Sequence, residues 1–337
     1  MNKKLMYRVK PAPLVFFVIG CIGLSFINIS GDFIINEVYI RFIRNTITAM
    51  ALIIPIWAGM GLNFSIVVGA MCSQAAMIFI VDKQILTIEG LILALVLSIL
   101  YSIFFGWIVG NILNKARGKE MIVSIVVGLL ATNIYQLIFM VGYGTIIPNQ
   151  NKSILLSRGI GVRNMVDIYP LKEIFMGNSY THLFVIAIVA FIIYYTGRTK
   201  LGNQFKVTRD SISKAKYLGI NTDRVRVTAI IMSTVLASIG HLMFMLEIGN
   251  VNVYTGHLNI DIFASAALLA GGATLFDADV KNAIIGVILF HFVFIITPLF
   301  GKTVFNNIAI GEYFRSFVAY GTIVIVFIIN LKTDNTI

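Results

Sequence analysis

Long apolar runs dominate the sequence, such as LILALVLSILYSIFFGWIVGNIL at residues 91–113. A helix rises about 1.5 Å per residue, so about 20 apolar residues cross a hydrocarbon layer of about 30 Å. Charged residues make up 12% of the 337 residues, whereas soluble domains carry about 25%. Membrane barrel strands would be about 10 residues long and would alternate polar with apolar residues. We therefore expect an all-α, polytopic membrane protein.

The apolar runs predict about ten membrane spans. They fall approximately at 13–29, 45–62, 64–81, 87–113, 121–142, 182–197, 225–249, 260–276, 280–300 and 312–331. The densest Lys and Arg segments are residues 1–10, 114–120 and 198–226. Because such residues collect in cytoplasmic loops, ten spans and a cytoplasmic N-terminus place all three segments and the C-terminus inside. The net charge of +11 is then attributed to topology rather than to nucleic-acid binding.

Residues 1–337 are expected to form one transmembrane domain with a retained first span. The N-terminal segment MNKKLMYRVK and the apolar run after it are similar to a signal peptide. They lack an A-x-A cleavage site, so we interpret the run as a span. The long, weakly basic loop 143–181 falls on the outer side of the membrane in this topology.

Two predicted spans contain clusters of helix-breaking and polar residues. The clusters are Pro55, Gly59, Gly61 and Asn63 in the first, and Gly271, Gly272, Asp277 and Asp279 in the second. Such a pair of discontinuous helices in a transporter points to the binding region. For either cluster taken alone, close helix packing or a short loop explains the residues as well as a discontinuous helix does. Gly106 and Gly110 have the spacing of small-residue packing, which we interpret as structural.

Several polar residues lie inside the predicted spans. Asn133 and Gln136 are three residues apart, which predicts a shared helix face. An interhelical hydrogen bond is the alternative to a solute contact for each residue. The candidate translocation path comprises Gly61, Asn63, Ser65, Gln74, Asn133, Gln136, Ser265, Gly271 and Gly272.

Motifs for catalysis, cofactors and metals are absent from the sequence. The GKT at Gly301–Thr303 is not a Walker A motif, because Ile296 stands where the motif has glycine. Cys21 and Cys72 lie in apolar runs and show no disulfide or metal spacing. Carboxylates deep in the spans are nearly absent, which argues against an ion-coupled pump. These absences argue against an enzyme and lead us to expect no cofactor in this chain, and they leave the energy source of any transport unexplained within it.

The segment TRDSISKAKYLGINTDRVRV, residues 208–227, separates two apolar runs. A solvated loop, a contact to nucleic acid or lipid head groups, and a protein-docking element are the alternatives. Asp210 is predicted to cap a helix over Ser211–Leu218, and Gly219 suits the left-handed position after it. If a partner binds this helix, Ile212, Ala215 and Leu218 or Ile220 would project toward it.

Three motifs in order resemble one protein family. They are LGNQFKVTRDSISKAKYLGINTDRVRV at 201–227, GLNFSIVVGA at 61–70 and LAGGATLFDADVKNAIIG at 269–286. The chain resembles the membrane subunits of bacterial ABC importers for simple sugars such as ribose, nucleosides and branched-chain amino acids. The resemblance covers roughly residues 45–331. Asn63, where the family commonly has aspartate, and DADV at 277–280, in place of a glycine-rich turn, indicate a divergent branch.

The resemblance implies a permease of the bacterial cytoplasmic (inner) membrane with both termini cytoplasmic and two inverted repeats, spans 2–5 and 7–10. A coupling helix in the cytoplasmic loop 198–224 would bind a separate ATPase subunit, which would hold ATP and Mg²⁺. The implied coupling residues are Arg209, Asp210, Ile212, Ala215, Lys216, Leu218, Gly219 and Ile220. A second permease subunit and an extracytoplasmic binding protein, docking near loops 143–181 and 250–259, would complete the importer. The alternative is an ion-coupled secondary transporter that works without an ATPase.

Overall fold

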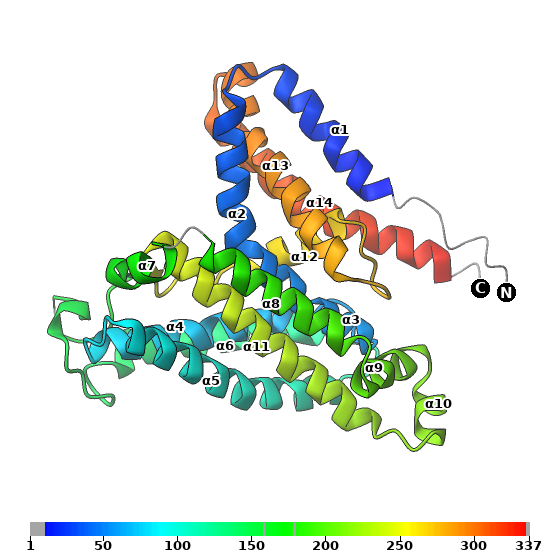
Figure 1. The fold of residues 1–337 in the computed structure, drawn as a ribbon, viewed down its shortest axis with the longest axis horizontal. Helices are drawn as coiled ribbons and strands as arrows, with labels where there is room; N and C mark the ends of the chain where they lie inside the picture. The colour runs from blue at the N-terminus through cyan, green and yellow to red at the C-terminus, as the bar shows by residue number, and fades with distance from the viewer. Residues whose placement is uncertain (1–10, 158, 178–179, 335–337) are drawn as a thin grey trace. The chain divides into compact units, whose positions relative to one another are not determined.

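The computed structural model describes residues 11–157, 159–177 and 180–334, and within them the fold is helical apart from one strand pair (Figure 1). The all-α expectation is thereby confirmed. The α-helices are α1 (Pro11–Ser25), α2 (Gly31–Ala51), α3 (Ile53–Trp57), α4 (Val67–Asp82), α5 (Ile88–Lys115), α6 (Glu120–Leu137), α7 (Tyr169–Met176), α8 (Thr181–Thr196), α9 (Lys200–Asp210), α10 (Ile212–Tyr217), α11 (Thr222–Ile248), α12 (Ile260–Ala270), α13 (Val280–Phe305) and α14 (Ile308–Asp334). The short 3₁₀ helices are η2 (Phe64–Ile66) and η4 (Lys152–Ile154), a π-helical turn is η3 (Ile138–Gly142), and the strands are β1 (Met165–Asp167) and β2 (Asn250–Asn252).

The protein is a multi-pass membrane protein. Six helical stretches of the described residues are long and apolar enough to cross a membrane, or seven if α7 and α8 form one bent span. The stretches are Gly31–Trp57, Phe64–Asp82, Ile88–Lys115, Glu120–Gly142, Thr222–Ile248 and Val280–Phe305. The predicted span 260–276 is interrupted, because α12 has only 11 residues, about 16 Å of helix. The predicted span 312–331 falls in α14, whose side chains are described as far as Val324.

The chain divides into two compact units, one of residues 1–42 with 265–337 and one of residues 43–264. In the unit 43–264, α11 packs against both α4 and α5, and Figure 1 shows α5 and α11 running alongside each other. The face of α5 that is buried carries mostly small residues at a spacing of about four. They are Gly90, Ala94, Ser98, Ser102, Gly106, Val109, Gly110 and Leu113. Small side chains let two backbones approach closely, which drives packing inside a membrane.

Gly106 and Gly110 of α5 lie close to the backbone of α11. A Cβ on Gly106 would lie 3.1 Å from the Cα of Ile231, and one on Gly110 would lie 3.2 Å from the Cα of Val227. The prediction that both glycines serve helix packing is confirmed. The outward face of α5 is apolar, as a surface in contact with lipid or another membrane helix requires.

The unit 1–42 with 265–337 is built around α13, which packs on α1 and α14. Asp279 caps α13 in a capping box. Its side chain accepts a hydrogen bond from the Asn282 backbone nitrogen, and the Asn282 side-chain oxygen accepts one from the Asp279 backbone nitrogen. A Cβ on Gly301 would lie 2.5 Å from the backbone nitrogen of Gly311 in α14. Glycine at this position therefore permits the tight α13–α14 crossing.

Strands β1 and β2 join two loops that are far apart in the sequence. They pair antiparallel, with Val166 opposite Val251. The loop that contains β1 is also fixed to the end of α4, where an Asp82 carboxylate oxygen accepts from the Asn149 amide at 2.8 Å and from the backbone nitrogens of Gln150 and Asn151 at 3.0 and 3.1 Å. Parts of the loops 143–181 and 250–259 therefore form one surface.

Candidate functional site

The first predicted interruption is a break between α3 and α4. The α-helix ends at Trp57, and Gly59 and Gly61 adopt φ values of +72° and +68°, a region that favours glycine. Asn63 then caps η2, because its Oδ1 accepts from the backbone nitrogen of Ser65 at 3.1 Å. Two glycines and an asparagine cap thus stop the helix and restart it.

Polar groups from two other helices hold this break. The Asn63 Nδ2 donates to the Ser233 hydroxyl of α11 at 3.3 Å, and the Phe64 backbone nitrogen donates to the Ser124 hydroxyl of α6 at 3.1 Å. Asn63 and Ser65 are buried. The structure thus brings together three predicted path residues, Gly61, Asn63 and Ser65, with two serines that the sequence did not single out.

A second polar cluster lies where the loop after β2 meets α4 and α6. The Gln74 Nε2 donates to the carbonyl of Asn252 at 3.0 Å, and the Gln136 Nε2 donates to the carbonyl of Tyr254 at 3.1 Å. The Tyr254 hydroxyl donates to the carbonyl of Val162 at 2.7 Å. The two predicted glutamines therefore bind the backbone of a single loop, residues 250–258, which we name the outer loop after the side of the membrane predicted for it.

Asn133 lies outside this cluster. Its side chain is exposed and donates to the carbonyl of Leu129, one turn earlier in the same helix, at 2.8 Å. The buried face of α6 is formed instead by Ser124, Gly128, Thr132 and Tyr135. Gln136, three residues later in α6, is part-buried and reaches the outer loop, so only one of these two neighbouring residues belongs to the cluster.

His257 of the outer loop is fixed in one tautomer by Gln74. The Asn252 carbonyl can only accept, so the Gln74 amide nitrogen faces it and the amide oxygen faces His257. The Nδ1 of His257, at 2.9 Å from that oxygen, must therefore carry the proton. Burial lowers the pKa of His257 to about 4, so the ring is neutral near pH 7 and its Nε2 is a hydrogen-bond acceptor.

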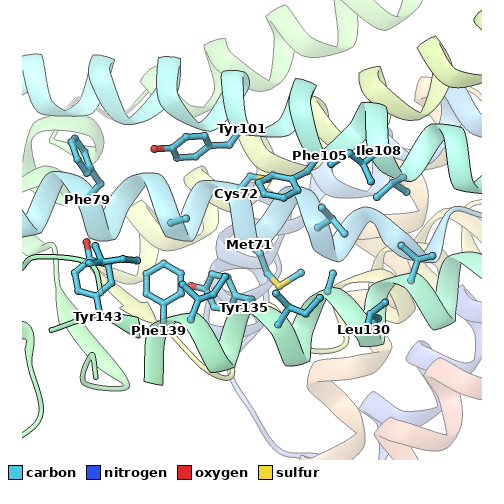
Figure 2. A pocket seen from close by; sticks show the side chains of 18 of the residues that line it. Met71, Cys72, Phe79, Tyr101, Phe105, Ile108, Leu130, Tyr135, Phe139 and Tyr143 are labelled. Atoms are coloured by element: carbon cyan, nitrogen blue, oxygen red, sulfur yellow. The ribbon is translucent and has the colours of Figure 1, made fainter. Parts of the chain in front are cut away.

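A pocket of about 520 Å³ lies between α4, α5 and α6 (Figure 2). In Figure 2, Met71 and Cys72 come from α4, Tyr101 and Phe105 from α5, and Tyr135 from α6. Apolar and aromatic side chains form most of its wall, and none of the residues described in that wall is charged. The volume is in the range of ligand pockets, about 300–1,000 Å³.

The second predicted interruption separates α12 from α13. After Ala270, Gly272 has φ of +86°, and the Gly271 carbonyl accepts from the Asn282 side chain at 2.8 Å. A Cβ on Gly271 would lie 1.8 Å from the carbonyl oxygen of Asn282, so only glycine fits. Ser265 is buried, and its hydroxyl has no hydrogen-bond partner among the described residues.

The predicted coupling helix is present as α10, with a different cap. Ser211, and not Asp210, caps it, because the Ser211 hydroxyl accepts from the Lys214 backbone nitrogen at 3.2 Å. Asp210 is the last residue of α9, and its carboxylate pairs with Arg209 at 3.0 Å. Gly219 has φ of +74°, as predicted for the residue after the helix.

The face of α10 differs from the prediction. Ala215 is completely buried within the chain, so it cannot contact a partner. Leu218 is 68% exposed, and Tyr217, which is not among the predicted coupling residues, is 95% exposed. Ile212 and Ile220 are half-buried, and Lys216 is exposed. The outward apolar surface of α10 is therefore Tyr217 and Leu218.

Helix α9, which falls within the predicted loop 198–224, connects α10 to the first break. A Cβ on Gly59 would lie 2.8 Å from the Cα of Arg209. The Lys206 ammonium lies 5.6 Å from the centre of the Trp57 ring and donates to the Gly197 carbonyl at 3.1 Å. Phe205 is completely buried. Helix α9 therefore rests directly on the end of α3 and on Gly59.

No group of three or more His, Cys, Asp or Glu residues within the described part of the chain could hold a metal ion. The two polar clusters hold neutral amides, hydroxyls and an imidazole. Such groups can bind and release a polar solute through hydrogen bonds.

The family model described as "Branched-chain amino acid transport system / permease component" matches residues 34–327. This range includes both interruptions and the segment 198–224. The chain belongs to this family. The permease is therefore a membrane transport subunit and not an enzyme.

Curated proteins similar to the permease include the Autoinducer 2 import system permease protein LsrC of several bacteria. The Escherichia coli (strain SMS-3-5 / SECEC) protein is 32% identical over 104 residues, or 31% of this chain and 30% of that protein. The Yersinia enterocolitica protein is 35% identical over 107 residues, or 32% of this chain and 29% of that protein. The permease thus spans about a third of the length of the curated relatives that it matches. No solved structure matches it.

Proposed function

We propose that the permease is the membrane-spanning subunit of an ATP-driven importer for a small polar solute. The observation that carries this proposal is the attachment of an exposed helix, α10, through α9 to the break at Gly59. Movement of α10 by a partner would be passed to a buried polar segment inside the membrane. The family assignment and the similarity to proteins named as import system permeases support the same function.

In this proposal a separate ATPase subunit grips Tyr217 and Leu218 and supplies the energy, with ATP and Mg²⁺ bound on that subunit. Aromatic and apolar side chains that are exposed on a short, positively charged helix are suited to a groove in a partner protein. Ala215, which is buried, holds the segment together instead of contacting the ATPase, whereas the Arg209–Asp210 pair remains accessible to it.

A second permease subunit would complete the path, and an extracytoplasmic binding protein would deliver the solute. The surface formed by loops 143–181 and 250–259 is the proposed docking site for the binding protein, because β1 and β2 unite the two loops. The permease would lie in a bacterial cytoplasmic membrane with ten spans in two inverted repeats and both termini inside. Alternating access would expose the two polar clusters in turn.

The docking role is tested by two variants and one control. Tyr217→Glu and Leu218→Glu should each reduce co-purification of the ATPase about tenfold or more, since exposed interface anchors contribute about 2 kcal/mol or more. Tyr169→Glu, at a 53% exposed tyrosine of α7, is the matched control and should leave co-purification unchanged. Normal ATPase recovery with both α10 variants would contradict the docking role.

The energy source is tested by uptake into membrane vesicles that carry the complete system. Uptake should require ATP and should survive an uncoupler that removes the proton gradient. Uptake that survives ATP depletion but stops with the uncoupler would overturn the proposal in favour of an ion-coupled transporter.

A further inference from the structure

The pocket between α4, α5 and α6 is open along one side. Its rim carries exposed apolar side chains, with Phe105 of α5 at 44% exposure and Leu130 and Ile134 of α6 at 60% and 49%. Every residue of α4 apart from Ala75 and Phe79 is buried, and both of these line the pocket. The pocket is therefore the place at which the otherwise enclosed α4 can be reached from the membrane.

The pocket is long and narrow. Its lining on α4 runs from Val68 to Phe79, which is about 16 Å of helix. The acyl chains of one leaflet fill about half of a hydrocarbon layer of about 30 Å, so the two lengths match. Spread over about 16 Å, a volume of 520 Å³ gives a mean cross-section of about 32 Å². A helix with its side chains is about 10 Å across, or about 80 Å² in section, so the pocket admits an unbranched chain but not a helix.

The two ends of the pocket differ in polarity. Figure 2 shows Tyr101 and Tyr143 toward the end formed by Phe79, and Leu130 toward the other end. Just past the end of α4, the Lys83 ammonium lies 5.7 Å from the centre of the Phe79 ring. Tyrosine is typical of the level at which lipid head groups meet the hydrocarbon layer. A phospholipid has the same order, with a phosphate at one end and an apolar chain behind it.

The charges around the pocket agree with this occupant. None of the wall residues that the structure describes carries a carboxylate, ammonium or guanidinium group, so a charged solute would be unfavourable there. The Asp82 carboxylate, next to Lys83, is already bound by three donors of the loop 149–151. The Lys83 ammonium beside the pocket is thus suited to bind a phosphate.

We propose that this pocket binds one acyl chain of a membrane phospholipid, whose phosphate lies at Lys83. The chain would fill the gap between α5 and α6 and cover Ala75 and Phe79. This lipid site goes beyond the import function and does not depend on it.

The test is photo-crosslinking of the full-length permease in phospholipid nanodiscs. A small fraction of the phosphatidylglycerol carries a diazirine in the middle of one acyl chain, and labelled peptides are identified by mass spectrometry. Label should appear in α4 at Ala75 or Phe79, and also on the outward face of α5 near Trp107, which is 55% exposed. Label near Trp107 without label in α4 would overturn the site, because the lipid then only surrounds the protein and the pocket is left to another occupant.

Two variants fill the pocket from different helices. Ala131→Phe in α6 and Ala75→Leu in α4 both change half-buried residues of the wall. Each should lower the remaining label in α4, relative to that near Trp107, about tenfold or more, because chain and added side chain cannot share the space. Val126→Phe, at a 59% exposed residue of α6 outside the pocket, is the matched control and should leave the ratio unchanged. An unchanged ratio in both filling variants would overturn the site.

The position of the phosphate is tested separately. Lys83→Gln should lower the label in α4 about two- to fivefold, as the loss of one partly exposed ion pair does. Lys115→Gln, at an exposed lysine in the last turn of α5, is the control and should have no effect on it. Equal label in α4 for the two lysine variants would overturn the contact between Lys83 and the phosphate.

Discussion

The contact between Gly59 and α9 can be tested by adding a single methyl group. Gly59→Ala should destabilise the permease in two ways. An L-residue at φ +72° costs about 1–2 kcal/mol. The new Cβ would also lie 2.8 Å from the Cα of Arg209 and 3.2 Å from its Cβ, so α9 must shift, and such overpacking costs typically about 1–3 kcal/mol. The total expected loss is about 2–5 kcal/mol.

Gly118→Ala is the matched control for the cost of placing an L-residue at a positive φ. Gly118 has φ of +79°, but a Cβ there would meet nothing within 4 Å. This variant should lose only about 1–2 kcal/mol. The difference between the two variants therefore isolates the steric contact with α9.

The assays are denaturant unfolding of the purified permease in detergent and limited trypsin cleavage after Lys214 and Lys216, which are exposed in α10. Gly59→Ala should unfold more easily and should be cleaved faster in α10 because α9 is displaced. Gly118→Ala should be cleaved at the unmodified rate. Equal destabilisation and equal cleavage of the two variants would refute the direct connection between the break and the coupling segment.

Three further predictions concern other parts of the unit 43–264. Arg226 is 2% exposed and pairs with Glu120, so Arg226→Met should cost about 3–5 kcal/mol in unfolding free energy, and a loss below about 1 kcal/mol would contradict the buried pairing. Ser211→Ala should speed hydrogen exchange in α10 by removing its cap, at about 1 kcal/mol, whereas Asp210→Ala should not, and the reverse result would restore the capping role first predicted for Asp210. Because the pKa of His257 is lowered to about 4, its neutral form stabilises the fold above the unfolded-state value of about 6.5, and this contribution is lost as the pH falls from about 6.5 toward 4. His257→Gln should therefore flatten the decline of the unfolding midpoint in that window, and an unchanged decline would count against a buried neutral His257.

Local chemistry made several features readable from the sequence. The breaks follow from glycines and caps that act on their own backbone, as at Gly59 and Asn63, and Gly219 ends α10 for the same reason. Competition between neighbouring caps was not readable. Ser211 caps α10 in place of Asp210, because Asp210 is the last residue of α9 and its carboxylate pairs with Arg209.

The sequence by itself determined that this chain enters a membrane and where its helices stop and restart, because hydropathy, φ preference and capping act within a few residues. The tertiary structure decided which side chains meet. It turned Ala215 inward and Tyr217 outward, left Asn133 outside the polar cluster, and joined Gln74 and Gln136 through backbone carbonyls of the outer loop. Every residue carries such a carbonyl, so the sequence contains no signal for these contacts, and only the packing of α4, α6 and the outer loop selects them.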